Sequence, residues 1–226
     1  MIANEFIFIA HTLLVTFAVT CAARYGQQAL TSIVVLFTLI ANLFVTQAIV
    51  LAGFTATSTD AFMVGSSLAL VLLQEQYGVT QARRAIIISF FGLVLFTLFS
   101  LVHMWYTPAP TDFMRPAFAA ILYTLPRLLI ASASAYLISQ YTNTVLYNLL
   151  KKKLPQSWFL TRTYGSIVCT QLLDTLLFSF LGLYGIMSNL GSIMLVSASI
   201  KLIAILTTVP LMKLLKTIKF ISVRES

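Results

Sequence analysis

Three ionisable side chains, Arg127, Asp174 and Lys201, stand inside long apolar runs of the chain. A charged side chain at the centre of a membrane helix costs roughly 2.5–3.5 kcal/mol on insertion scales. Because an apolar helix has no need of them, we interpret the three residues first as parts of a binding site. The alternative is mutual pairing that only locks helices together, and Lys201 has the further alternative of reaching toward the membrane surface.

Polar side chains recur at helical spacing around these charges. Residues four apart share one helix face, and two such stripes occur, one of Ser166, Thr170 and Asp174 with Gln171 and Phe178 on the same broad face, and one of Ser132, Tyr136, Gln140 and Thr144. Asn42 stands alone in an earlier apolar run. Polar stripes more commonly join helices to one another, but stripes beside an aspartate and an arginine favour a wet cavity of ligand size.

The chemistry that these residues suit is recognition rather than catalysis. A carboxylate such as Asp174 accepts two N–H bonds from a planar, amidine-like edge such as that of guanine. Gln171, Gln140 and Asn42 can read ring nitrogens and carbonyls, and Phe178 can stack on a flat ring. The sequence contains no HExxH, GxSxG or P-loop motif and no Cys/His spacing typical of zinc or haem. We therefore expect no enzyme, no metal and no cofactor.

The composition predicts the elements that position these residues. Of 226 residues, 59% are hydrophobic and 9% charged, with a mean hydropathy of +0.96, whereas soluble domains carry about 25% charged residues. This excludes a soluble domain, a disordered chain and a secreted disulfide scaffold. A crossing takes about 20 residues, so the chain predicts an all-α, polytopic membrane helix bundle, a single domain over 1–226. The apolar runs are 6–23, 28–52, 60–76, 85–105, 117–147, 163–186 and 189–212.

The distribution of cations predicts seven spans with the N-terminus outside and the C-terminus inside. With that topology, eleven of the 14 Lys and Arg residues fall in cytoplasmic segments, and Arg115, beside Asp112, is the single cation of the external ones. Six spans would break the alternation. The third run is short, and two interpretations stay open: an interrupted span that marks a transport site, or a short, untilted helix with Glu75 at the interface.

An ordered set of motifs resembles the queuosine precursor transporter family of vitamin-uptake-like carriers. The resemblance runs from about residue 36 onward and implies a six-helix core, to which the first run is an N-terminal addition. Pro126-Arg127 and Lys201 fall where that family carries intramembrane cations. The other residues that carry the resemblance are Asn42, Gly53, Glu75 to Gly78, Ala82-Arg83, Ile130 to Ser132, Ala135-Tyr136, Ser139-Gln140, Asn143, Arg162, Ser166, Gln171 to Thr175 and Phe178.

The resemblance implies a 7-deazaguanine substrate, either the nitrile-substituted preQ0, the aminomethyl-substituted preQ1 or the finished base queuine. Val71 departs from the family, which usually places Asp or Asn there, so a polar substrate contact is either missing or supplied by Glu75 or Gln74. The expected substrate-binding residues are Asn42, Glu75, Arg127, Gln140, Gln171, Asp174, Phe178 and Lys201.

We expect a carrier that moves this base through the cytoplasmic, or inner, membrane of a bacterium. The alternative is a substrate-capture subunit of an ATP-driven, energy-coupling-factor-type vitamin importer, which docks its motor through small residues such as Ser132 to Ala135 or Ser197 to Ser199. A structural or enzymatic membrane protein is the third interpretation. The expected partners are the 7-deazapurine and the lipid bilayer, without nucleic acid, and a homo-oligomer is left open.

Overall fold

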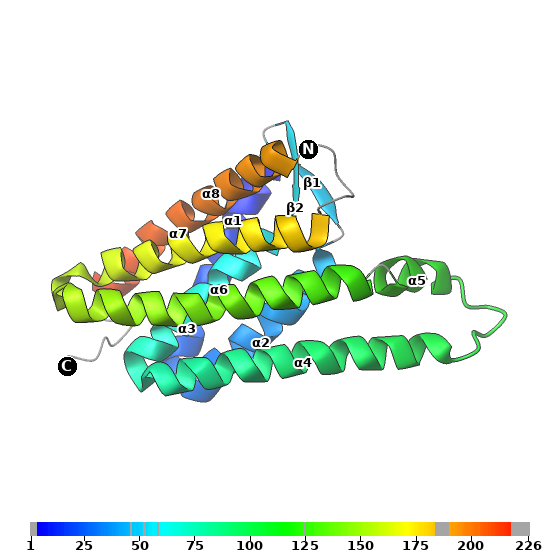
Figure 1. The fold of residues 1–226 in the computed structure, drawn as a ribbon, viewed down its shortest axis with the longest axis horizontal. Helices are drawn as coiled ribbons and strands as arrows, with labels where there is room; N and C mark the ends of the chain where they lie inside the picture. The colour runs from blue at the N-terminus through cyan, green and yellow to red at the C-terminus, as the bar shows by residue number, and fades with distance from the viewer. Residues whose placement is uncertain are drawn as a thin grey trace.

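The computed structural model describes residues 4–45, 47–51, 53–57, 59–123, 125–183 and 190–217. They form a bundle of helices with one small β-hairpin (Figure 1). In chain order the elements are α1 (Asn4–Tyr25), α2 (Gln27–Phe44), β1 (Ala48–Leu51), β2 (Phe54–Thr57), α3 (Thr59–Tyr77), α4 (Val79–Trp105), α5 (Arg115–Tyr123), α6 (Leu125–Lys153), η1 (Gln156–Trp158), α7 (Phe159–Phe178), a π-helical turn η2 (Ser179–Leu183) and α8 (Leu190–Thr217).

Helix α3 is the axis of the bundle. The other long helices of the described chain form a ring around it, in the order α1, α2, α4, α6, α7, α8 and back to α1, and α3 packs against all six of them. Fifteen of its 19 residues are buried. The third apolar run is thus one continuous, central helix, and the expectation of an interrupted span is wrong.

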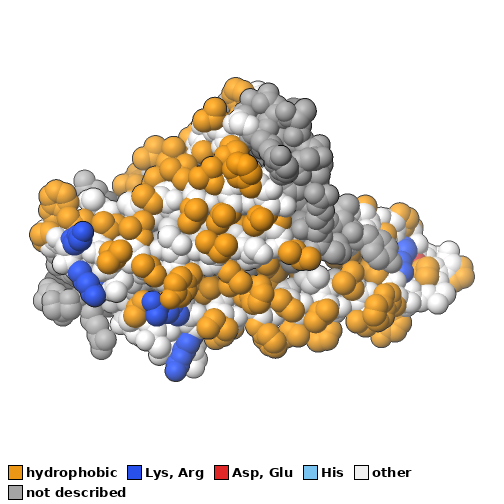
Figure 2. All heavy atoms as spheres, viewed as in Figure 1, with side chains coloured by type: hydrophobic (Ala, Val, Ile, Leu, Met, Phe, Trp, Pro, Cys, Tyr) orange, Lys and Arg blue, Asp and Glu red, His pale blue; other side chains and the backbone are white. Residues whose placement is uncertain are grey.

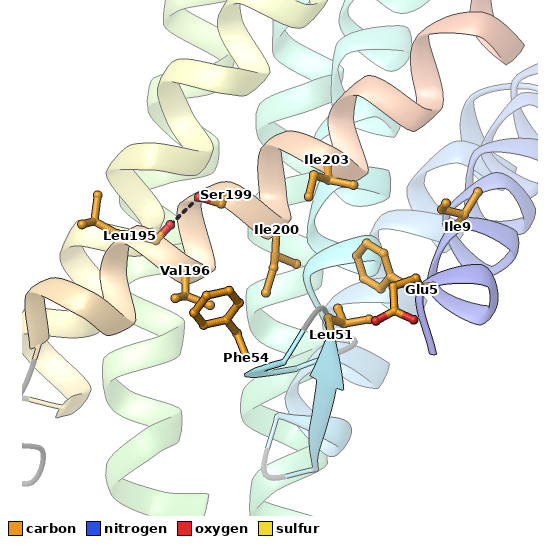
Figure 3. A pocket seen from close by; sticks show the side chains of 10 residues that line it. Glu5, Ile9, Leu51, Phe54, Leu195, Val196, Ser199, Ile200 and Ile203 are labelled. Carbon is orange, nitrogen blue, oxygen red and sulfur yellow. Dashed lines mark hydrogen bonds between the residues drawn. The ribbon is translucent and has the colours of Figure 1, made fainter. Parts of the chain in front are cut away.

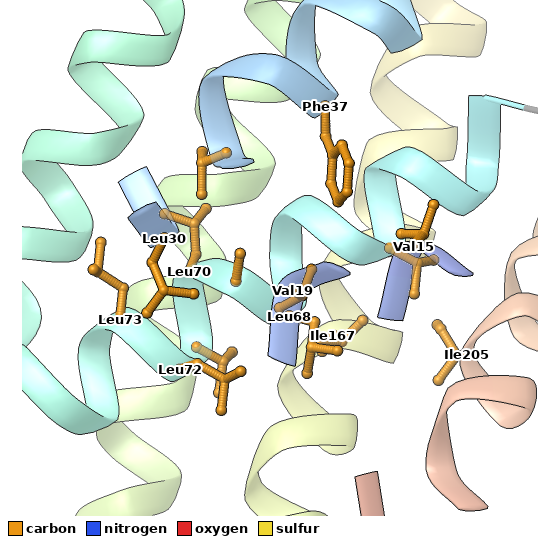
Figure 4. Close-up of a cluster of buried hydrophobic side chains, with 14 of the residues drawn as sticks. Val15, Val19, Leu30, Phe37, Leu68, Leu70, Leu72, Leu73, Ile167 and Ile205 are labelled. Carbon is orange, nitrogen blue, oxygen red and sulfur yellow. The ribbon is translucent and has the colours of Figure 1, made fainter. Parts of the chain in front are cut away.

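The core lies where α3 meets its neighbours. Leu68, Leu70, Leu72 and Leu73 of α3 are fully buried, and side chains of α1, α2, α7 and α8 close around them, as Figure 4 shows for Val15, Val19, Leu30, Phe37, Ile167 and Ile205. A helix that is surrounded on every side needs no apolar stripe. This explains why the third run shows no single hydrophobic face.

Gly65 allows α1 and α2 to approach α3 closely. A Cβ at this position would collide with Cγ1 of Val15 and would lie 3.1 Å from Cε2 of Phe37. Small residues at helix contacts let backbones pack closely inside membranes. The absence of a side chain at Gly65 is therefore explained by helix packing.

Two apolar runs are divided in ways that hydropathy did not predict. The run 28–52 is not one span, because α2 ends at Phe44 and β1 then pairs antiparallel with β2. The connection of the hairpin includes Gly53 with φ +82°, a conformation that suits glycine. Apolar content alone does not distinguish a short strand from a helix end.

The run 117–147 contains two helices, α5 and α6, and α6 continues to Lys153. Pro116 and Pro126 lie in the first turns of these helices. Proline is tolerated there because the first N–H groups of a helix have no partner within it. The second proline therefore allows a new helix to start inside an apolar run.

The surface is that of a helical membrane bundle. Among the described residues, α1, α2, α4 and 159–181 are helices long and apolar enough to cross a membrane. Large apolar side chains such as Phe91, Leu98 and Phe99 of α4 point outward. Figure 2 shows hydrophobic atoms spread over the visible face and Lys and Arg gathered mainly toward one end. The expected all-α bundle is confirmed, apart from the hairpin.

The close approach at Gly65 makes a stability prediction. Gly65→Ala should lower the thermal unfolding midpoint in detergent, because the new methyl group overpacks the α1–α2–α3 contact at a cost of about 1–3 kcal/mol. Gly165→Ala is the matched control, since its Cβ would lie 3.7 Å from Cδ1 of Leu150, an ordinary contact. Equal midpoints for the two variants would contradict the packing described here.

Candidate functional site

Three layers of buried polar side chains follow one another along α3. Asp60, Ser67 and Gln74 are spaced by seven residues, which places them on about the same face at intervals of about 10 Å. Glu75 follows Gln74 directly. Each layer includes partners from two neighbouring helices, and we name the layers the Asp60 cluster, the amide cluster and the Glu75 cluster.

The Asp60 cluster consists of Asp60 on α3, Asp174 on α7 and Lys201 on α8. Nζ of Lys201 donates a hydrogen bond of 2.7 Å to Oδ2 of Asp174 and lies 3.9 Å from Oδ1 of Asp60. The side chains are at most 10% exposed. The cluster therefore holds two carboxylates and one ammonium group. Of the two carboxylates, only that of Asp174 is within hydrogen-bond distance of the ammonium.

The amide cluster is centred on Ser67. Its Oγ accepts hydrogen bonds from Nε2 of Gln140 at 3.0 Å and from Nε2 of Gln171 at 2.9 Å. Its backbone carbonyl accepts one from Nδ2 of Asn143 at 3.4 Å. These contacts join α3 to α6 and α7 through the N–H groups of three amides.

The side-chain oxygen atoms of two of these amides, Gln171 and Asn143, accept no hydrogen bond from a described residue. Oε1 of Gln171 and Oδ1 of Asn143 are buried and have no hydrogen-bond partner in the described part of the chain. A buried acceptor without a partner costs about 1–3 kcal/mol. The amide cluster thus contains two hydrogen-bond acceptors to which no described residue of the protein donates.

The Glu75 cluster occupies the other end of α3. The hydroxyl of Tyr147 donates to Oε2 of Glu75 at 2.7 Å, Nζ of Lys151 lies 3.1 Å from the same oxygen, and Nη2 of Arg162 lies 3.7 Å from Oε1. Arg162 is only 1% exposed. Glu75 is thus held by a phenol and two cations, and it ties α3 to α6 and α7.

The structure brings some of the predicted residues together and separates others. Gln140 and Gln171 meet at Ser67, and Asp174 meets Lys201. Phe178 is half-buried at the end of α7, one turn beyond Asp174. The side chain of Arg127 lies outside the described residues, so its predicted approach to Asp174 stays a prediction.

Asn42 and Glu75 lie apart from that group. Asn42 donates to the carbonyl of Thr38 and accepts from Oγ of Ser132, so it joins α2 to α6. Val71 belongs to the apolar core, and Nε2 of Gln74 donates to the carbonyl of Thr144 at 2.9 Å. The replacement of the polar contact at residue 71 by Glu75 or Gln74 stays a prediction.

An apolar pocket of about 330 Å³ opens between α1, the hairpin and α8 (Figure 3). Its lining is almost entirely apolar and consists of Phe8, Ile9, Leu51, Phe54, Leu195, Val196, Ile200 and Ile203, with Glu5 and Ser199. None of the predicted site residues is among them. Its lining offers a polar base few partners, so we place the candidate site in the polar layers.

The sequence analysis did not identify Asp60, Ser67 or Tyr147 as site residues, and it included Arg162 only as a cytoplasmic cation and as one of the residues that carry the family resemblance. It did not place a second acid beside Asp174, whereas Asp60 shares Lys201 with it. A signal was present, because the seven-residue spacing of Asp60, Ser67 and Gln74 marks one polar face in an otherwise apolar run.

Comparison with known proteins gives the family. A family model described as "Putative vitamin uptake transporter" matches residues 61–215. The chain belongs to this family. A relative from Bacillus subtilis (strain 168), named "Probable queuosine precursor transporter", is 30% identical over 164 residues, which cover 71% of this chain and 72% of the relative. No solved structure matches the chain.

Membership in this family makes the protein a transporter rather than a member of an enzyme family. Together with the membrane-length apolar helices, it identifies a multi-pass membrane protein. The matched residues include all of the amide cluster and the Glu75 cluster, and they include Asp174 and Lys201. Apart from Asp60, which directly precedes the matched residues, the polar layers thus lie within the part of the chain that matches the family.

Proposed function

We propose that this vitamin uptake transporter carries a 7-deazaguanine precursor of queuosine into the cytoplasm. The observation that carries the proposal is the pair of buried, unpartnered acceptors, Oε1 of Gln171 and Oδ1 of Asn143, in the layer that follows the Asp60 cluster along α3. Gln171 and Asp174 are three residues apart on α7 and so share a helix face. The name of the Bacillus relative supports the same substrate class.

The donors of a 7-deazaguanine match these acceptors. Its guanine edge carries an N1–H and an exocyclic amine, and its five-membered ring carries a further N–H. Asp174 would take the two donors of the guanine edge, while the amide oxygens would take the remaining N–H groups. Lys201 would hold the carboxylate in place through its hydrogen bond, and Phe178 would offer the face of its ring to the flat base.

The remaining predicted residues have secondary roles in this proposal. Gln140 would hold Ser67 and, through it, Gln171 in place. Asn42 would support α6 through Ser132, and Glu75 would hold the opposite end of α3. Arg127 would lie near the entrance to the site, in the first turn of α6.

We further propose that α1, α2, α3, α4, α6, α7 and α8 all cross the cytoplasmic membrane of a bacterium, with the N-terminus outside. The cation distribution supports this orientation. Lys151 and Arg162 lie around the α6–α7 connection, and Arg83 and Arg84 follow the α3–α4 connection. The exposed aromatic residues Trp105, Tyr106 and Phe113 would lie at the opposite interface.

The alternative is a capture subunit that depends on a separate ATP-driven motor. Such a subunit needs small residues on an outward helix face. In the first cluster, Ala135 is 1% exposed and Ser132 bonds to Asn42 inside the bundle, whereas Ser199 of the second cluster is exposed. Because these residues of the first cluster face the bundle, we favour the independent carrier.

The test of the proposed function uses the purified full chain. Its thermal unfolding midpoint should rise with preQ0, preQ1 or queuine and not with adenine, which presents no N1–H donor. Proteoliposomes that contain this protein alone should then take up the labelled base that stabilised it most. If no 7-deazaguanine stabilises the protein, the proposal is wrong; if one binds but does not enter the vesicles, the capture subunit is the correct function.

Substitutions at the acceptors should weaken binding. Asp174→Asn puts an amide N–H opposite a donor of the base and should cost about 2–4 kcal/mol, or roughly 30- to 1,000-fold in affinity. Gln171→Met should cost about 1 kcal/mol, or roughly fivefold. Gln74→Met is the matched control, since Gln74 also has a bonded N–H group and an unpartnered oxygen but lies in another layer.

These affinities are to be titrated on variants that remain folded and monodisperse. The role of Asp174 as only a salt-bridge partner of Lys201 predicts a lower stability and an unchanged affinity. An Asp174→Asn protein that binds every 7-deazaguanine as the wild type does would remove Asp174 from the site. A Gln74→Met protein that loses affinity as Gln171→Met does would place the base at a different depth.

The orientation is tested by cysteine labelling in a variant without Cys21 and Cys169. Thr111 and Lys153 are exposed positions near opposite ends of the bundle. In intact cells, an impermeant thiol reagent should label Thr111→Cys, whereas Lys153→Cys should react only after the membrane is opened, because of the positive-inside rule. Labelling of Lys153→Cys from outside would reverse the orientation.

A further inference from the structure

We propose that Asp60 binds one proton together with each base, which makes the protein a proton-coupled importer. This inference rests on the proposed function and adds its source of energy. Its basis is the composition of the Asp60 cluster, in which two carboxylates share one ammonium group in a buried setting.

Among the side chains that the structure describes, the cluster is out of balance by one charge. If Asp60 and Asp174 are both ionised, the single ammonium of Lys201 leaves one excess negative charge among side chains that are at most 10% exposed. A buried and uncompensated charge is strongly unfavourable. One proton on a carboxylate removes the excess, so the charge count predicts one proton per cluster.

Asp60 is the carboxylate that takes this proton. Lys201 donates its 2.7 Å hydrogen bond to Asp174, whereas Asp60 lies 3.9 Å from the ammonium, beyond hydrogen-bond distance. The better-paired carboxylate keeps its charge, and the other one accepts the proton. Asp174, hydrogen-bonded to Lys201, then offers its other oxygen to the donors of the base.

Other titratable groups near this end of α3 do not supply the missing positive charge. From α1, the ring of His11 meets the ring of Phe62 edge-on at 4.6 Å, so it packs on an apolar neighbour. Helix α2 has no charged residue, Arg83 and Arg84 are at the opposite end of α4, and the ring of His103 in the last turn of α4 meets the ring of Tyr106 edge-on at 6.0 Å.

Arg127 of α6 is the remaining cation to consider. The contact between Gln140 and Ser67 marks the same level on α6 and α3. Arg127 precedes Gln140 by 13 residues on α6, whereas Asp60 precedes Ser67 by only seven residues on α3. At 1.5 Å per residue, the backbone of Arg127 is about 9 Å further along the bundle axis than that of Asp60.

Binding of the base would promote binding of the proton. A flat ring that enters beside Asp174 displaces water from the cluster, and lower solvation disfavours the charged form of a carboxylate. Base and proton therefore bind with positive coupling, and the coupling is reciprocal. At a lower pH the base binds more tightly, and a proton gradient directed inward drives its accumulation.

The decisive measurement is the number of protons taken up by the wild-type protein when it binds preQ0, a base without a titrating side chain. Calorimetric titrations near pH 7 in buffers of different ionisation enthalpy should report uptake of up to about one proton per base. The affinity should increase by up to about tenfold for each unit that the pH falls. Binding without proton uptake and without pH dependence would overturn the inference and leave the proposed function intact, whereas no binding of any 7-deazaguanine would remove the proposed function itself.

Asp60→Asn imitates the protonated side chain in size and charge. This variant should bind preQ0 with an affinity independent of pH and without proton uptake, and in proteoliposomes it should exchange labelled for unlabelled base but not accumulate it along a pH gradient. Asp112→Asn, in an exposed loop, and His11→Gln are controls that should keep proton uptake. Loss of proton uptake in His11→Gln, or its persistence in Asp60→Asn, would assign the proton to a group other than Asp60.

Discussion

The burial of α3 on all sides is the constraint on which the rest of the structure depends. A helix at the centre of a ring of six has no access to lipid or water along most of its length, so each polar side chain on it needs a partner from a neighbouring helix. Asp60, Ser67, Gln74 and Glu75 find such partners on α6, α7 and α8. Because these partners come from different helices, the polar contacts also fix how the ring is arranged around its axis.

The three layers differ in how completely their groups are paired, and this difference separates support from function. In the Glu75 cluster, one carboxylate is matched by a tyrosine hydroxyl and two cations. In the amide cluster, the N–H groups are bonded while two carbonyl oxygens are not. In the Asp60 cluster, one carboxylate is better paired than the other. Buried polar networks are costly when they are incomplete. Oε1 of Gln74, beside Glu75, is also unpartnered, but the carboxylate of that layer is matched by cations, so we assign base and proton to the other two layers.

The sequence predicted the class of fold and the helices, because apolar runs of about 20 residues follow directly from the thickness of a bilayer. It did not predict the end of α2 at Phe44 or the division between α5 and α6. Hydropathy measures only apolar content, so it does not report the turn at Gly53 or the helix start at Pro126. The pattern also identified Gln140, Gln171, Asp174 and Lys201 as buried polar residues. It missed Asp60 and Ser67 because their importance comes from helices α6, α7 and α8, more than 70 residues away in the chain.

The central claim, that a 7-deazaguanine binds in the polar layers of α3, is tested most directly by an experimental structure of the protein with preQ0 bound. The account predicts that the guanine edge lies within hydrogen-bond distance of Asp174, with ring N–H groups near Oε1 of Gln171 and Oδ1 of Asn143. A base found instead in the apolar pocket between Phe8 and Ile203, with Asp174 still bonded only to Lys201, would contradict it.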